Sequence, residues 1–104
     1  MELTKDSDKL ICSAYKNYLE RRKSGESKLN AKHFKSGFYK EIKALASWNE
    51  QDVRDTLAEL KRANFVKLYI DGGFQLNDSA IIYMENRFKN GLADVTEFLS
   101  KFIP

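Results

Sequence analysis

The sequence predicts a mostly α-helical fold with one small two-stranded antiparallel β-hairpin and an additional helix at the C-terminal end. Three patterns predict it: apolar residues recur every three or four positions in several segments, one short segment alternates apolar and polar residues, and two consecutive glycines follow that segment. The 104 residues, of which 42% are hydrophobic, suffice for a single domain, 1–104, around one core.

The first helix is expected over about residues 5–23. Thr4 or Ser7 can cap its start, and Gly25 can adopt the left-handed conformation that closes a helix. Its apolar residues lie three or four positions apart and share one face: Leu10, Ile11, Ala14, Tyr15, Tyr18 and Leu19.

A second helix is expected over about residues 31–45, after an extended link through Lys28 and Leu29. Gly37 lowers helix stability by about 1 kcal/mol relative to alanine, which leaves open whether the helix begins only after it. The apolar residues that predict this helix are spaced by four, four and three positions: Phe34, Phe38, Ile42 and Leu45.

The third helix is expected over about residues 49–63. Either Ser47 caps it, with Glu50 reaching back to complete a capping box, or Asn49 caps it while Trp48 packs against its first turn. Its buried stripe is predicted to be Val53, Leu57 and Leu60.

A hairpin is expected over about residues 66–76, after a left-handed stop at Asn64. Its first strand alternates apolar and polar residues, and Gly72 and Gly73 tolerate the positive φ of a tight turn. Two further amphipathic helices are expected over about 78–89 and 93–103.

This order of elements resembles that of winged helix-turn-helix domains. In the stretch 47–90, a capped helix runs directly into the hairpin, and the segment 74–86 resembles the Leu-Thr-x-x-Gly-x-x-Tyr-Leu pattern that follows the wing in many such proteins. The chain is similar to the small YjcQ-like winged-helix proteins of Gram-positive bacteria and their phages, and more distantly to the PadR and MarR regulators. The resemblance implies a non-catalytic DNA-binding protein, a small transcriptional regulator of a bacterium or phage.

The resemblance also implies how duplex DNA is bound. The third helix of such a domain enters the major groove, while neighbouring elements contact phosphates. Gln51 can pair with adenine and Arg54 with guanine, because each side chain can make two hydrogen bonds to that base edge. The residues expected to contact DNA are Lys32, Lys35, Lys40, Lys43, Ser47, Asn49, Gln51, Arg54, Arg62 and Lys67.

The charge distribution bears on this expectation in two ways. Residues 16–43 hold nine basic and three acidic side chains, an excess that is typical of a polyanion binder and also of a lysine-rich surface in water. Four acids on the third helix weaken its attraction to phosphates: Glu50, Asp52, Asp55 and Glu59. The alternative is therefore a protein-interaction adaptor that does not bind nucleic acid, with Tyr69 and Phe74 in the contact.

The last predicted helix has a broad apolar face that allows two interpretations. It either folds back onto the first helix or pairs two copies of the chain into a homodimer, as terminal helices of related regulators do. The residues of the predicted dimer interface are Val95, Phe98, Leu99, Phe102 and Ile103.

No catalytic site, metal or cofactor is expected. His33 has no second His or Cys nearby in the sequence and is expected to be a partly exposed helical residue, and the single cysteine, Cys12, lies in a helical pattern typical of a buried structural thiol. The N-terminal segment carries Glu2 and Asp6, and no apolar run reaches the length of a membrane-spanning helix, so a cytoplasmic protein without membrane contact is expected.

Overall fold

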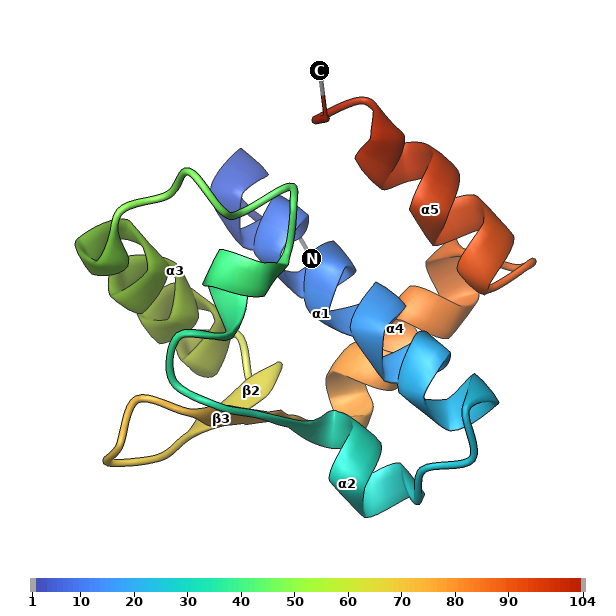
Figure 1. Ribbon diagram of the computed structural model, residues 1–104, viewed down its shortest axis with the longest axis horizontal. Coiled ribbons are helices and arrows are strands. Elements are labelled where there is room, and N and C mark those ends of the chain that lie inside the picture. Colours follow the sequence, from blue (N-terminus) through green and yellow to red (C-terminus); the bar gives the residue numbers. More distant parts are fainter. Residues whose placement is uncertain (1, 104) are drawn as a thin grey trace.

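The computed structural model of the protein describes residues 2–103. The described chain is mostly helical with a small antiparallel sheet (Figure 1). In chain order, the elements are α1 (Lys5–Lys23), α2 (Lys28–Lys32), β1 (His33–Phe34), the 3-10 helix η1 (Phe38–Glu41), α3 (Glu50–Arg62), β2 (Val66–Leu68), β3 (Phe74–Leu76), α4 (Asp78–Arg87) and α5 (Leu92–Ser100).

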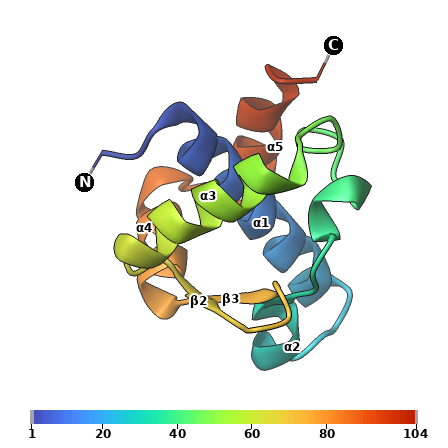
Figure 2. The ribbon, with the colours of Figure 1, turned by 90° about the vertical axis from the view of Figure 1, so that its left-hand side faces the viewer.

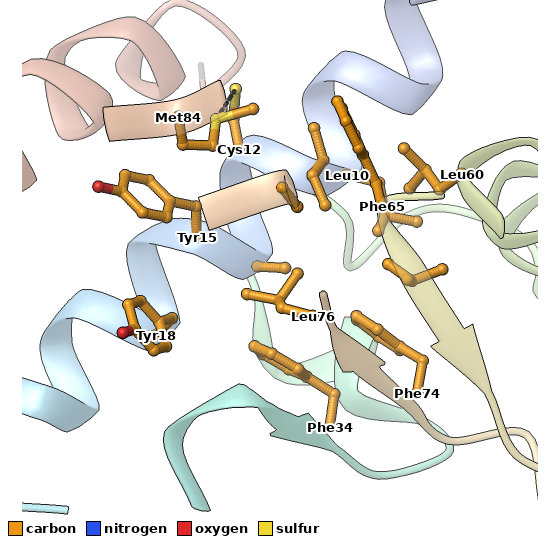
Figure 3. Packing of buried hydrophobic residues seen from close by; sticks show 14 of the residues in the cluster. Leu10, Cys12, Tyr15, Tyr18, Phe34, Leu60, Phe65, Phe74, Leu76 and Met84 are labelled. Atoms are coloured by element: carbon orange, nitrogen blue, oxygen red, sulfur yellow. Dashed lines mark hydrogen bonds between the residues drawn. The ribbon is translucent and has the colours of Figure 1, made fainter. Parts of the chain in front are cut away.

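Helix α1 is the centre of the molecule and contacts α2, α3, α4 and α5 (Figure 1). Of its two candidate caps, Thr4 takes the role, since its Oγ1 accepts a hydrogen bond from the Ser7 N–H at 3.1 Å. Gly25, with a φ of 96°, follows the end of the helix as predicted. Apolar side chains of α1 meet those of the sheet, α3 and α4 in one core, in which Figure 3 labels Leu10, Cys12, Tyr15, Tyr18, Phe34, Leu60, Phe65, Phe74, Leu76 and Met84.

The sheet has three strands in the order β1-β3-β2, and both pairings are antiparallel. The predicted hairpin over 66–76 is confirmed by β2 and β3, but the prediction of two strands is wrong because β1 joins the other edge of β3. Phe34 on β1 lies opposite Phe74 on β3, and their rings stack at 4.7 Å between centroids.

The single helix predicted over 31–45 is wrong. The link expected to be extended is α2, which Ser27 caps by accepting a hydrogen bond at its Oγ from the Asn30 N–H at 3.1 Å. The chain then forms β1, turns, and is helical again only in η1, before a series of turns that leads to α3.

Gly37 and the sheet explain this error. Gly37 has a φ of 82°, in the left-handed region that a right-handed helix cannot contain. Phe34 and Phe38, four residues apart, both lie against Phe74, at 4.7 and 4.9 Å between ring centroids. Their spacing therefore matches a helical face although the residues approach the core from a strand and from a separate 3-10 turn.

Helix α3 begins and ends at polar residues. Asn49 is its cap, accepting a hydrogen bond at Oδ1 from the Asp52 N–H at 3.0 Å, so the second of the two predicted starts is the observed one. Asn64, with a φ of 63°, ends it as predicted, and the Phe65 N–H donates to the Leu60 carbonyl at 2.9 Å. The predicted buried stripe is confirmed, with exposures of 4%, 4% and 0% for Val53, Leu57 and Leu60.

Helices α4 and α5 are slightly shorter than the predicted 78–89 and 93–103. Helix α5 folds back along α1, which was one of the two alternatives for this segment (Figure 1). Val95 and Leu99 are 0% and 4% exposed in the chain's own core, so neither side chain is available to a second copy. None of the helices within the described residues has the length and apolar character that crossing a membrane requires.

Cys12 is fully buried on α1, and its Sγ lies 4.0 Å from the Met84 Sδ (Figure 3). Burial raises the pKa of this thiol far above its ordinary value, and the nearby Asp8 carboxylate raises it further. The thiol therefore keeps its proton in the folded chain, as expected of a structural cysteine.

We expect the protein to lose stability at alkaline pH because of Cys12. Below about pH 8.5 the thiol is protonated in both states and the full stability is present; above it the unfolded thiol ionises while the folded one does not. The free energy of unfolding should then fall by up to about 1.4 kcal/mol per pH unit. Denaturant unfolding at a series of alkaline pH values measures this slope.

Cys12→Ala is the variant to compare. Its free energy of unfolding should be nearly independent of pH just above pH 8.5. A remaining slope at higher pH is expected from Tyr15, whose pKa burial also raises. An equally steep decline in Cys12→Ala and in the parent chain would assign the alkaline loss to another group.

Candidate nucleic-acid interface

Helix α3 turns one side to the core and leaves the opposite side free. Figure 2 shows α3 in front of α1, with no other element drawn over it. Gln51, Asp55 and Arg62 are exposed and follow one another at helical spacing on this outer side. The buried side consists of Val53, Thr56, Leu57 and Leu60.

The acidic residues of α3 are not evenly spread around the helix. Glu59 points toward the start of α1, where its carboxylate oxygens accept hydrogen bonds from the hydroxyls of Thr4 and Ser7, each at 3.4 Å. Asp52 is seven residues before Glu59 and lies on the same flank. Two of the four acids that count against DNA binding therefore lie on the α1 side of the helix.

The opposite flank of α3 faces the hairpin and η1. Glu50 and Arg54 line a small hollow of about 190 Å³ together with the segment 36–39 and the hairpin tip at 70–72. Lys61 is seven residues after Arg54 and lies on this same flank. This flank carries two basic residues and one acidic residue, whereas the α1 flank carries two acidic ones.

The predicted base-contacting side chains are engaged within α3. Arg54 pairs with Glu50 at 3.2 Å, and the Gln51 amide donates to the Asp55 carboxylate at 3.0 Å. Arg54 and Glu50 are 67% and 63% exposed, and such pairs stabilise a helix by only about 0.3–0.5 kcal/mol. Arg54 and Gln51 can therefore exchange these partners within the helix for a DNA base at little energetic cost.

The structure removes Lys32 from the predicted DNA contacts. Its ammonium lies 3.4 Å from the Asp78 carboxylate at the start of α4, and its side chain is only 13% exposed. It takes this position because α2 ends at Lys32 and the chain turns into β1, where a continuous helix was expected. The other predicted contacts are exposed: Lys35, Lys40, Lys43, Ser47, Asn49, Gln51, Arg54, Arg62 and Lys67.

The hairpin tip is closed by hydrogen bonds of its own and lies close to β1. The Gly73 N–H donates to the Asp71 carboxylate at 2.8 Å, and the Tyr69 N–H donates to the Gly73 carbonyl at 2.9 Å. A Cβ on Gly73 would lie 2.7 Å from the Phe34 carbonyl oxygen, so only glycine fits there. Ile70 stands at the tip with its side chain completely exposed.

The outer face of the sheet is a second exposed surface, which the sequence did not indicate. His33 is an exposed strand residue and not a helical one, and its ring stacks on that of Tyr69 at 5.4 Å and 7°. The period-two pattern of the hairpin placed Tyr69 and Lys67 on the solvent side, but it contained no sign of a third strand that brings His33 beside them. Phe74, proposed for a protein contact, is fully buried.

An open hollow of about 1160 Å³ adjoins this face and is bordered by His33, Lys35, Tyr69 and residues from α1 and η1. Within residues 2–103, no three His, Cys, Asp or Glu side chains gather as a metal site would require. Comparison with protein-family models, curated proteins and solved structures gives no match. The function is therefore inferred from the geometry of the chain alone.

Proposed function

We propose that the chain is a winged-helix protein that binds duplex DNA and catalyses no reaction, and that it serves as a small bacterial or phage transcriptional regulator. In this proposal α3 enters the major groove and the β2–β3 hairpin is the wing. The observation that carries it is the distribution of charge on α3: Asp52 and Glu59 lie on the α1 flank, while the outer side and the hairpin flank hold three basic residues, Arg54, Lys61 and Arg62, against two acidic ones, Glu50 and Asp55.

Further contacts to phosphates come from the segment that leads to α3. Lys40 and Lys43 are exposed in η1 and the turns after it, and Ser47 and Asn49 are exposed at the start of α3. These residues immediately precede the reading helix in the chain, so cations in this segment can fix the helix on the backbone of the duplex. Binding by such contacts is strongly salt-dependent and only weakly sequence-specific.

The test is the binding of a labelled random duplex, followed by fluorescence anisotropy at low and physiological salt. We expect binding at micromolar protein and a steep loss of affinity with salt. Arg54→Ala should weaken binding through the loss of a base contact, and Lys43→Ala should weaken it and lower the slope of log affinity against log salt by about one, as expected of a phosphate contact. Lys89→Ala, an exposed lysine after α4, is the matched control and should change neither value.

A salt-independent affinity, or an absence of binding by the parent chain at micromolar concentration, would refute duplex binding. The same conclusion follows if Lys89→Ala and Arg54→Ala reduce the affinity equally, because the effect would then depend on total charge and not on α3.

The second candidate function is a protein-interaction adaptor, and the exposure of Ile70 favours it. The tip of a DNA-reading wing usually benefits from basic residues, whereas here a completely exposed isoleucine precedes Asp71. An adaptor would use this tip and the acidic residues of α3 to hold a partner with an apolar and basic surface. Loss of partner capture in Ile70→Lys, with duplex binding absent in the parent chain, would support this function over the first.

A homodimer through α5 would depend on the residues of the predicted interface that remain accessible. Phe102 and Ile103 are each 40% exposed, and Phe98 is half-buried against Phe88. Measurement of the mass in solution for Phe102→Lys and for the parent chain tests this arrangement. A monomeric parent chain would exclude it.

A further inference from the structure

The outer face of the sheet presents one side chain from each strand along a single line. Gln75 on β3 is the register partner of both His33 on β1 and Lys67 on β2. Because side chains alternate along a strand, these three lie opposite the face that buries Phe34 and Phe74. Figure 2 shows α1 and α3 above the strands β2 and β3, with α2 below one end of the strands. On this face His33 and Lys67 are exposed, and Gln75 between them is half-buried.

The polar and aromatic groups on this face are held in place. The rings of His33 and Tyr69 are nearly parallel, 7° apart, with centroids at 5.4 Å. The Tyr69 hydroxyl donates to the Gln75 Oε1 at 3.0 Å, which orients the amide and leaves its NH₂ group free to donate to a ligand. Two flat rings and an oriented amide thus form a small preorganised platform.

Two lysines flank the platform. The Lys67 Nζ lies 5.8 Å from the centre of the Tyr69 ring, and Lys35 follows β1 two residues after His33. Both lysines are exposed, and neither forms an ion pair with another residue of the segment 2–103. The platform therefore combines aromatic surface with positive charge that no internal partner neutralises.

The charges that border the hollow beside the platform determine which part of a ligand this hollow can accommodate. Besides Lys35 and Arg21, it is bordered by three carboxylates: Glu26, Glu41 and Asp71. Because carboxylates outnumber basic side chains around the hollow, its interior favours a base or a sugar over a phosphate group. Phosphates are instead attracted to the two lysines at the margins of the platform.

We propose that the outer face of the sheet binds single-stranded nucleic acid. A base stacks on the outward face of the His33–Tyr69 ring pair, the Gln75 amide donates to a base edge, and Lys35 and Lys67 contact phosphates. Aromatic rings between basic side chains on an open sheet suit unpaired bases, since the bases of a duplex are already stacked on one another. The site is separate from α3 and does not require the duplex-binding function, although Lys35 and Lys67 also belong to the residues predicted to contact duplex DNA; Tyr69 and Arg54 are the residues that distinguish the two sites.

The direct probe is His33, because it is the only histidine in the chain and its ring signals in an NMR spectrum need no further assignment. On titration with a short oligothymidylate or oligoadenylate, we expect these signals to shift upfield as a base stacks on the ring. The same titration followed by anisotropy of a labelled oligonucleotide gives the affinity.

Variants then locate the contact. Tyr69→Ala should weaken oligonucleotide binding about tenfold, through the loss of one stacked base, whereas Tyr69→Phe keeps the ring and should retain most of the affinity. Lys67→Gln should lower the salt slope by about 0.7, the value for one phosphate of a single strand. Lys89→Gln is the matched charge control, and Arg54→Ala leaves this site intact while it tests the duplex site.

An absence of oligonucleotide binding at micromolar protein would overturn the proposal and leave a protein partner as the occupant of this face. Binding that leaves the His33 signals unmoved, or that Arg54→Ala weakens as much as Tyr69→Ala does, would also overturn it. Failure of duplex binding alone leaves the oligonucleotide results unaffected, so the two functions are tested independently. The His33 shift in the parent chain remains decisive if Tyr69→Ala does not fold.

Discussion

Replacement of Phe74 by alanine is expected to lower the free energy of unfolding by about 3–5 kcal/mol. Phe74 is fully buried at the centre of the sheet, and its ring lies 4.7 Å from that of Phe34 and 4.9 Å from that of Phe38, between centroids. Truncation removes the apolar contact and leaves a cavity between β1 and η1, two elements that are too short to close it by themselves.

Ile70→Ala is the matched control, since it lies in the same hairpin and is completely exposed. It should change the free energy of unfolding by no more than about 0.5 kcal/mol. Urea denaturation followed by the fluorescence of Trp48 measures both variants. Equal losses in the two variants would mean that the hairpin tip, and not the ring of Phe74, joins the sheet to the core.

Replacement of Arg87 by methionine is expected to destabilise the protein by about 2 kcal/mol. The two terminal guanidinium nitrogens of Arg87, Nη1 and Nη2, donate to the Asp8 carboxylate, Nη2 at 3.0 Å, and join the end of α4 to α1. This carboxylate raises the pKa of Arg87, and the guanidinium also lies 4.9 and 4.7 Å from the ring centres of Phe88 and Phe98. The change removes these contacts and leaves a carboxylate that is only 22% exposed without its partner.

A double-mutant cycle separates the contribution of the ion pair with Asp8 from that of the aromatic contacts. Asp8→Asn combined with Arg87→Met should be more stable than the sum of the single changes implies, because it leaves no unpaired carboxylate. Lys89→Met, two residues later and exposed, should be nearly neutral. Strict additivity of the two changes would show that the aromatic contacts account for the whole loss.

The sequence predicted α1, α3 and the hairpin because their signals are local. A helix needs an apolar stripe and caps within its own length, and a hairpin needs alternation and a turn. Asn49, Asn64 and the stripe of Val53, Leu57 and Leu60 all lie within or beside α3, so the bounds of this helix followed from neighbouring residues.

The sequence misassigned the segment 31–45 because the decisive contacts are distant. Phe34 and Phe38 show helical spacing, but their common partner is Phe74, far along the chain. The same reason applies to Lys32, which pairs with Asp78, and explains why it does not belong to the candidate interface.

By itself, the sequence determined the helical class of the protein, the buried side of α3 and the hairpin that follows it. The tertiary structure alone decided which surfaces remain free: Glu59 turns toward α1, Val95 and Leu99 are buried where α5 packs on α1, and His33 stacks on Tyr69 across the sheet. Local periodicity specifies which side of an element is apolar, but strand pairing and helix packing join residues that no local pattern relates, and only these contacts fix what a ligand can reach.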